Sequence, residues 1–313
     1  MTVKSPKTSS PRTQPKLAWD ALSGIDIITL IYTAWIMFYM AIGWSRAANP
    51  LIHFPRYLAI FVLVIVFAYV HKKVSKHPSS QLSQALIFIR SIYPISLFGY
   101  FFVGGYVVNR IIFACWQDPL FYKLDKLIFG YSPSLVWGKT FAHPLIDEFF
   151  AFAYFSYYPM IVGLPILLWF KDRKAFHHCI FCLTFVFYLC YFIYSWLPVI
   201  GGRYFSEAME LSKQSNGYLF SAIMAFIYQN SHHLGGAFPS SHVAIALTLS
   251  IAAWQYRKSL GTIMLALTFF LSIATVYCHY HWFVDAIAGI LMGLVGYLTA
   301  AYVYKFLPRI SDE

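Results

Sequence analysis

Long apolar runs separated by short polar connections are the feature that most constrains how this chain folds. A helix needs about 20 apolar residues to cross the hydrocarbon core of a bilayer. Hydrophobic residues make up 59% of the 313 residues. Charged residues make up only 11%, against about 25% in a typical soluble domain. The sequence therefore predicts an all-α polytopic membrane protein, folded as one unit without a separate soluble domain.

Eight of the apolar runs are candidate transmembrane helices, of which the second and the sixth are short. The runs lie at about 25–45, 56–70, 85–114, 148–170, 177–198, 241–256, 260–278 and 283–305. A further segment, residues 116–140, alternates charged and apolar residues and contains Pro119 and Pro133. This pattern is typical of an interfacial helix or a re-entrant turn. We therefore expect about eight transmembrane helices.

Basic residues occupy every second connection between these runs. They are Lys4, Lys7, Arg12 and Lys16, then Lys72, Lys73 and Lys76, then Lys171, Arg173 and Lys174, then Arg257 and Lys258, and finally Lys305 and Arg309. Because short cytoplasmic connections carry an excess of Lys and Arg, both termini are predicted to be cytoplasmic. The net charge of +11 is dispersed over these connections, so no nucleic-acid partner is expected.

Residues 1–24 are polar and rich in Ser, Pro and Lys. No cleavage site is evident in this segment. It is predicted to be a disordered cytoplasmic tail and not a signal peptide.

Two polar side chains mark the start of the last apolar run. His281 and Asp285 are four residues apart, so on a helix they share one face within hydrogen-bond reach. The carboxylate can fix the tautomer of the imidazole and make its other nitrogen a better nucleophile. The alternative is a buried pair that only braces helix packing.

A second polar cluster, Phe238-Pro239-Ser240-Ser241-His242, precedes the sixth run. Pro239 is placed to open a helix and Ser240 to act near its cap. The free N–H groups of that first turn, with the two serine hydroxyls, are predicted to form an anion-binding cradle. His242 lies in the same turn and can protonate a leaving alkoxide. The alternative is a simple capped helix start.

Arg203 follows the fifth run, in Gly201-Gly202-Arg203. Its guanidinium suits the non-bridging oxygens of a phosphoryl group, whereas the alternative is an interfacial arginine that snorkels. Arg203 and the two polar clusters fall in connections on the same, non-cytoplasmic side, which predicts one external site. His279 leaves a metal site as a further alternative. Histidines two apart on a helix point in different directions, however, and we predict no metal.

These residues resemble the motifs of a known family. Pro-Ser-Ser-His followed by His-x-x-x-Asp, each at the edge of a span, is similar to two motifs of the type 2 phosphatidic acid phosphatase superfamily. Ser241 stands where the family usually has glycine, Thr275 where an arginine is common, and Trp196 where a lysine is expected. These departures resemble the inositol phosphorylceramide synthase-like branch more closely than the commonest phosphatases.

The resemblance implies an enzyme that needs neither metal nor cofactor. It implies a six-helix core, placed at residues 81–308, with two additional N-terminal helices within 25–80. His281 would be the nucleophile that forms a phosphohistidine, Asp285 its orienting group, and His242 the general acid and later the base. Three further residues would hold the phosphoryl group: Arg203, Ser240 and Ser241.

The function expected on these grounds is that of a lipid phosphatase or phosphotransferase. It would cleave a lipid phosphate ester and pass the phosphoryl unit to water or to a lipid hydroxyl. The alternatives are a metal-independent phospholipid headgroup transferase, and, from another class, a lipid transporter or a catalytically silent membrane protein. The expected location is a bacterial inner membrane, with the site on the non-cytoplasmic side. The sequence leaves the oligomeric state open.

Overall fold

The computed structural model describes residues 21–74, 81–213, 217–229 and 234–310, and within these ranges it consists of helices and connections without a β-strand. The predicted tail falls almost entirely outside these ranges. The first helices are α1 (Gly24–Ile42), α2 (Pro50–Val74), α3 (Gln81–Gly104), α4 (Asp118–Phe129), α5 (Pro133–Thr140), α6 (Pro144–Phe155) and α7 (Tyr157–Lys171). The remainder are α8 (Arg173–Tyr194), α9 (Ser206–Lys213), α10 (Leu219–Gln229), α11 (Ser241–Tyr256), α12 (Lys258–Tyr277) and α13 (Phe283–Val303). Short 3-10 turns lie at Gly105–Val107, Gly202–Tyr204 and Tyr304–Phe306.

Seven segments of the described chain are long and apolar enough to cross a membrane. They are Gly24–Ile42, Pro50–Val74, Ser83–Val107, Pro144–Lys171, Arg173–Tyr194, Lys258–Tyr277 and Phe283–Phe306. The fourth of these comprises both α6 and α7, which meet at Ser156. This architecture confirms the prediction of an all-α polytopic membrane protein.

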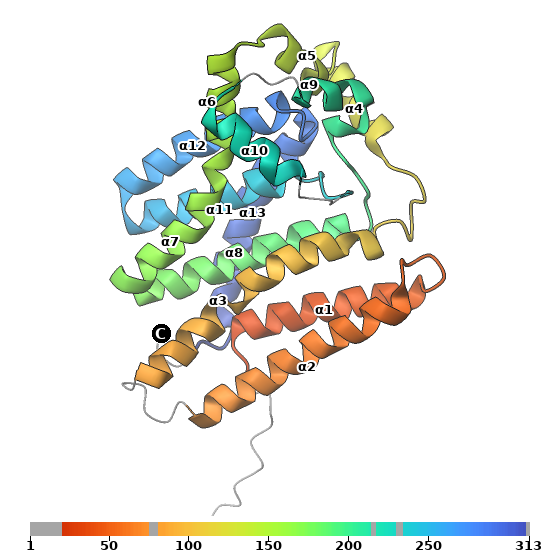
Figure 1. Ribbon diagram of the computed structural model, residues 1–313. Helices are drawn as coiled ribbons and strands as arrows, with labels where there is room; N and C mark the ends of the chain where they lie inside the picture. Colours follow the sequence, from red (N-terminus) through yellow and green to blue (C-terminus); the bar gives the residue numbers. More distant parts are fainter. Residues whose placement is uncertain (1–20, 75–80, 214–216, 230–233, 311–313) are drawn as a thin grey trace, which may run out of the picture.

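The predicted sixth span is α11, a helix of only 16 residues. At 1.5 Å per residue it is about 24 Å long, whereas the hydrocarbon core is about 30 Å thick. It packs against α8, α12 and α13, and most of its residues are buried. Figure 1 places it in the middle of the helices that follow α3.

The segment predicted to be an interfacial helix or a re-entrant turn forms two separate helices, α4 and α5. Its prolines begin these helices, because Pro119 and Pro133 both occupy the first turn, where the missing N–H is not needed. Between the helices, Gly130 closes α4 with a left-handed backbone (φ 77°). Both helices lie together at the top of Figure 1, near the start of α13.

The N-terminal helices pack directly on the rest of the molecule. Within the membrane, α1 lies against α8, where the hydroxyls of Thr29 and Tyr188 are 3.2 Å apart. Trp35 Nε1 donates to Ser195 Oγ at 3.0 Å. Helices α1, α2, α3 and α8 run side by side in the lower part of Figure 1. The packing therefore joins the predicted N-terminal pair of helices to the predicted six-helix core. The division between these two parts remains a prediction.

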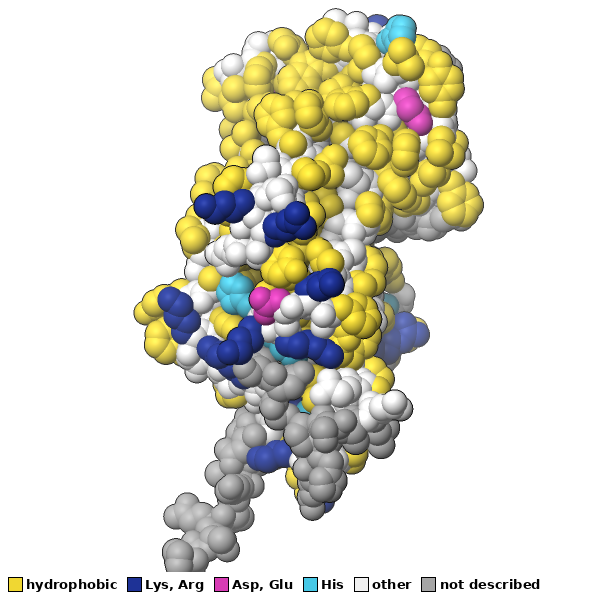
Figure 2. All heavy atoms as spheres, turned by 90° about the vertical axis from the view of Figure 1, so that its left-hand side faces the viewer, with side chains coloured by type: hydrophobic (Ala, Val, Ile, Leu, Met, Phe, Trp, Pro, Cys, Tyr) yellow, Lys and Arg dark blue, Asp and Glu magenta, His cyan; other side chains and the backbone are white. Residues whose placement is uncertain are grey.

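Basic side chains gather on one face of the molecule, as Figure 2 shows. The connections that carry them are the end of α2, the α7–α8 and α11–α12 junctions, and the segment after α13. Because successive membrane-spanning segments run in opposite directions, these four basic connections lie at the same end of the helix bundle. The pattern agrees with the positive-inside rule, and which side is cytoplasmic stays a prediction.

Candidate active site

His281 lies in the short connection between α12 and α13, and Asp285 lies in the first turn of α13. Both side chains are buried, with 5% and 0% of their surface exposed. His281 Nδ1 is 3.5 Å from Asp285 Oδ2, within ion-pair range but longer than a normal hydrogen bond. The same Oδ2 accepts the N–H of Trp282 at 2.9 Å, which fixes the carboxylate at the helix start. The structure thus brings the two side chains close together, and the orienting role of Asp285 stays a prediction.

The second cluster joins the first through the backbone. Ser240 is the N-cap of α11, and its N–H donates to the carbonyl of Asp285 at 3.0 Å. Pro239 therefore precedes the cap and does not itself open the helix. The Tyr194 hydroxyl donates to the Pro239 carbonyl at 2.6 Å and accepts the N–H of Ser241 at 3.1 Å.

These contacts define what remains of the predicted anion cradle. The N–H groups of Ser240 and Ser241 are engaged, which leaves those of His242 and Val243 at the start of α11. The hydroxyl of Ser240 makes no capping hydrogen bond and stays buried beside them. The donors that remain for an anion are thus the Ser240 hydroxyl and the N–H groups of His242 and Val243.

The imidazole of His242 is held between two aromatic rings of the α6–α7 segment. Its ring centroid lies 4.9 Å from that of Tyr154 and 4.6 Å from that of Tyr157. The His242 and His281 ring centroids are 6.2 Å apart. The two imidazoles, which are 39 positions apart in the sequence, thus lie close together.

Four buried polar atoms of these two clusters have no hydrogen-bond partner among the described residues. They are Ser240 Oγ, His242 Nδ1, His281 Nδ1 and Asp285 Oδ1. A folded protein leaves few buried polar groups unsatisfied, because each one costs about 1–3 kcal/mol. Four such atoms at one place indicate a site built for a polar ligand.

Arg203 reaches the same region from the turn Gly202–Tyr204. Its guanidinium carbon lies 3.7 Å from the ring centroid of Tyr228 and 4.5 Å from that of Tyr280. The turn packs closely on the connection between α12 and α13, because Gly201 adopts a left-handed backbone with φ 94°. A Cβ at Gly201 would lie 2.2 Å from the carbonyl oxygen of Tyr280. Only glycine fits both the backbone conformation and this approach.

The electrostatics of the site favour a neutral His281. Burial, together with the nearby charges of His242 and Arg203, lowers its pKa to about 3, although a hydrogen bond to the backbone of Ala237 opposes the shift. A neutral imidazole has a free lone pair, which a nucleophile requires. The structure thus brings together the six residues predicted for the site: Arg203, Ser240, Ser241, His242, His281 and Asp285.

Two acidic residues that sequence reasoning missed hold this arrangement from α4. Asp118 accepts the N–H of Ile200 and of Gly201, and Asp125 accepts those of Phe283 and Val284 at the start of α13. Burial raises the pKa of both carboxyl groups, and the accepted hydrogen bonds oppose the rise. Their seven-residue spacing, which puts them on one helix face, was the available signal.

His279 serves an anchoring role. Its ring Nδ1 is hydrogen-bonded to the carbonyl of Ser134 in α5, and its backbone has φ 63°. Within the described ranges, no three His, Cys, Asp or Glu side chains are grouped so as to hold a metal ion. Thr275, which stands where the resembled family commonly has arginine, binds its own helix through Oγ and accepts the N–H of Tyr280 and of His281 at its carbonyl. It shapes the backbone of the connection.

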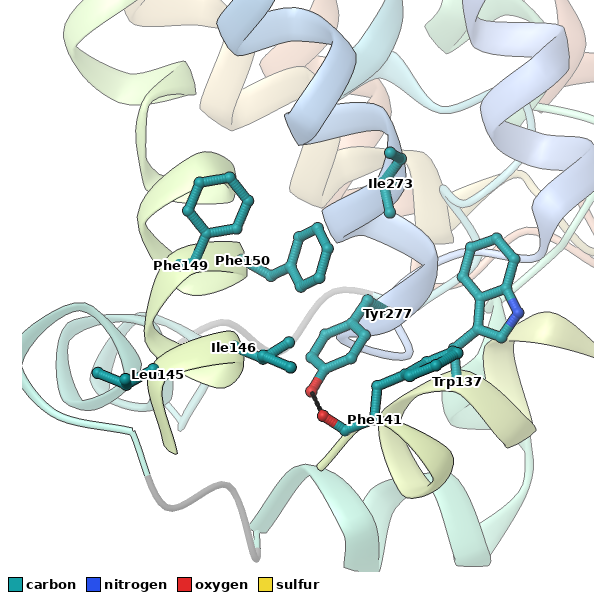
Figure 3. A pocket seen from close by; sticks show the side chains of 8 residues that line it. All are labelled: Trp137, Phe141, Leu145, Ile146, Phe149, Phe150, Ile273 and Tyr277. Carbon is teal, nitrogen blue, oxygen red and sulfur yellow. Dashed lines mark hydrogen bonds between the residues drawn. The ribbon is translucent and has the colours of Figure 1, made fainter. Parts of the chain in front are cut away.

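An apolar groove of about 530 Å³ opens next to the site, between α5, α6 and α12. Figure 3 shows the rings of Phe150, Tyr277 and Trp137 along its length. One lining residue approaches the connection that bears His281, because the ring centroid of Trp137 lies 6.0 Å from that of Phe283, two residues after His281. Other lining residues, such as Leu145 at 63% exposed, face outward.

The fold and the site define an integral membrane protein of a recognisable class. The sequence profile described as the PAP2 superfamily matches residues 121–299, more than half of the chain. The chain therefore belongs to the PAP2 superfamily, which confirms the resemblance to the type 2 phosphatidic acid phosphatases. Placement in the inositol phosphorylceramide synthase-like branch remains a prediction.

Two curated relatives are similar over shorter stretches. The chain is 29% identical over 96 residues to the putative undecaprenyl-diphosphatase YbjG of Escherichia coli (strain K12), covering 28% of this chain and 48% of that protein. It is 28% identical over 80 residues to the bacitracin transport permease protein BcrC of Bacillus licheniformis, covering 26% of this chain and 38% of that protein. The chain thus spans less than half the length of either relative. No solved structure shows a significant similarity to the chain.

Proposed function

We propose that this protein is a lipid phosphate phosphatase that works through a phosphohistidine on His281. The observation that carries the proposal is the cluster of four buried, unpartnered polar atoms between the starts of α11 and α13. Membership of the PAP2 superfamily and similarity to a putative undecaprenyl-diphosphatase support it.

In the first step, the lone pair of a His281 ring nitrogen forms a bond to phosphorus, and the bond from phosphorus to the ester oxygen breaks. The leaving oxygen takes a proton from His242, whose ring centroid lies 6.2 Å from that of His281. Asp285 steadies the imidazolium charge that develops on His281.

In the second step, water attacks phosphorus while His242 takes its proton, and the bond from phosphorus to nitrogen breaks. Inorganic phosphate leaves and both histidines return to their starting forms. The transition states spread negative charge over the equatorial oxygens of the phosphoryl group. Arg203, the Ser240 hydroxyl and the first free N–H groups of α11 are the donors that stabilise this charge.

A lipid alcohol is the leaving group that fits the surroundings best. The groove beside the site is apolar and faces outward along helices that lie in the membrane. A hydrocarbon chain can occupy this groove through van der Waals packing, because lipid tails are as apolar as the residues that line it. We place the site on the non-cytoplasmic side of a bacterial inner membrane, as the basic connections on the other side favour.

Phosphoryl or headgroup transfer to a lipid hydroxyl is the second candidate. Position 275, where hydrolases of the resembled family commonly have a cation, is a threonine bound to its own helix. The same phosphoenzyme then passes its phosphoryl unit to a lipid alcohol in place of water.

Purified protein in detergent, assayed with a panel of lipid phosphates, tests both candidates. We expect release of inorganic phosphate, unaffected by a chelator and reduced at least about 1,000-fold by His281→Asn. Thin-layer separation of the products identifies the acceptor, because a newly phosphorylated lipid defines the second candidate. Full activity of His281→Asn rejects the histidine mechanism, and loss of activity with chelator indicates a metal.

A further inference from the structure

Asp118 is the most connected buried carboxylate near the site that the proposed chemistry leaves without a role. It lies in the first turn of α4 and none of its surface is exposed. Its Oδ1 accepts the N–H of Gly201 at 2.8 Å and the indole Nε1–H of Trp282 at 2.9 Å. The N–H of Ile200 is 3.0 Å from Oδ2 and 3.1 Å from Oδ1.

These donors come from two connections that carry different parts of the site. Gly201 lies two residues before Arg203, and Trp282 directly follows His281. Trp282 is fully buried, and its own N–H binds Asp285. A single carboxylate therefore ties the loop that bears the guanidinium to the loop that bears the nucleophile.

The two connections also touch directly, which makes their relative position sensitive to this carboxylate. Gly201 packs on the carbonyl of Tyr280, and the Arg203 guanidinium lies on the Tyr280 ring. A shift of the Gly201 loop moves the guanidinium along with it. Displacing a binding group by about 1 Å can lower a rate about 100-fold.

We propose that Asp118 is a positioning residue that sets the separation between Arg203 and His281 and thereby allows one phosphoryl group to contact both. The inference rests on the proposed function, because it assigns these two residues to the phosphoryl group. Asp118 itself touches neither the phosphoryl group nor the leaving oxygen. Its effect passes through Arg203.

A double-mutant cycle tests this dependence. The variants are Asp118→Asn, Arg203→Ala and the two combined, in otherwise full-length protein. The readouts are kcat/KM on a lipid phosphate and the affinity for orthovanadate, measured by calorimetric titration. Asp118→Asn keeps the size of the side chain, removes the negative charge and leaves one acceptor oxygen for three donors, which weakens the tie.

If Asp118 acts through Arg203, Asp118→Asn lowers both readouts about 100-fold in the native background and less than about threefold in Arg203→Ala. Equal losses in both backgrounds, or no loss in either, overturn the proposal. A native protein that binds orthovanadate but hydrolyses no lipid phosphate contradicts the proposed function alone. A native protein that binds no orthovanadate overturns both.

Two further variants separate positioning from folding. Asp172 caps α8 by accepting the N–H of Ala175 at 2.9 Å, at a place remote from the site, so Asp172→Asn is the matched control and should leave both readouts unchanged. If Asp118→Asn does not fold, Trp282→Phe removes one donor only, and the same dependence on Arg203 is expected. Losses from Trp282→Phe that are independent of Arg203 contradict the proposal.

Discussion

At the residue scale, the site is a set of polar atoms that the fold buries and leaves unpaired. Ser240, His242, His281 and Asp285 each contribute one such atom. Hydrogen bonds between backbone groups, such as that from Ser240 N–H to the Asp285 carbonyl, hold the two polar clusters together. The side chains are thereby left available for a ligand.

The lowered pKa of His281 gives a prediction for the pH dependence of activity. Because the neutral imidazole is the nucleophile, activity falls as pH drops through the pKa of His281, which lies at about 3 and not near the usual 6.5. We expect kcat/KM, corrected for titration of the substrate, to show no loss of the nucleophile between pH 7 and about pH 5. An acid limb near pH 6.5 that reports a single ionisation of the free enzyme would contradict the burial of this histidine.

The sequence allowed prediction of those site residues that stand in short motifs. His281 and Asp285 are one helical turn apart, and Ser240 to His242 are consecutive, so local geometry was enough. The spacing of Asp118 and Asp125 marks one helix face, but the partners of Asp118 could not be predicted, because Gly201 and Trp282 are 83 and 164 positions away and only the folded chain brings them together. The engagement of the Ser241 N–H by Tyr194 is hidden for the same reason.

At the element scale, helix ends place the chemistry. Helix α11 has only 16 residues, and its start places His242 directly after the N-cap Ser240 and the first residue Ser241. The sequence predicted this helix and Ser240 near its cap, but it placed Pro239 at the helix start, whereas Pro239 lies one position before the cap. Residues 116–140 were predicted as one interfacial helix or re-entrant turn, whereas they form two helices, and Pro133 begins the second of them, α5.

The groove between α5, α6 and α12 gives a prediction about chain length. Ile273→Trp fills part of the groove, so it should raise KM about tenfold for a long-chain lipid phosphate and leave a short-chain, soluble phosphate ester unaffected. Ile263→Trp is the matched control, because Ile263 lies on the same helix, is 60% exposed and does not line the groove. Equal effects of Ile273→Trp on both substrates would show that the groove does not hold the lipid chain.

At the scale of the whole molecule, a buried ion pair joins helix α1 to helix α3. Arg90 Nη2 of α3 binds Asp26 Oδ2 of α1 at 2.5 Å, and both side chains are at most 4% exposed. Arg90 also donates to the Ala21 carbonyl and contacts His71 Nδ1 of α2 at 2.8 Å. These contacts lie in the first three helices, apart from His242 and His281, so they bear on stability and not on the chemistry.

Breaking this pair should destabilise the protein without altering its chemistry. Arg90→Met leaves Asp26 buried beside a lost cation, so we expect a loss of about 3–5 kcal/mol in the free energy of unfolding, measured in detergent. The double variant Asp26→Leu with Arg90→Met should regain most of it, because neither charge remains buried. A double variant as unstable as the single one would indicate that Arg90 acts through its other contacts.

The central claim is that the phosphoryl group passes through His281, and trapping the intermediate tests it most directly. The protein is mixed with a ³²P-labelled lipid phosphate, quenched within milliseconds under alkaline conditions and mapped by mass spectrometry. We expect one labelled peptide with phosphate on His281 in the native protein and none in His281→Asn. Phosphate on another residue, or product formed at full rate by His281→Asn, would contradict the account.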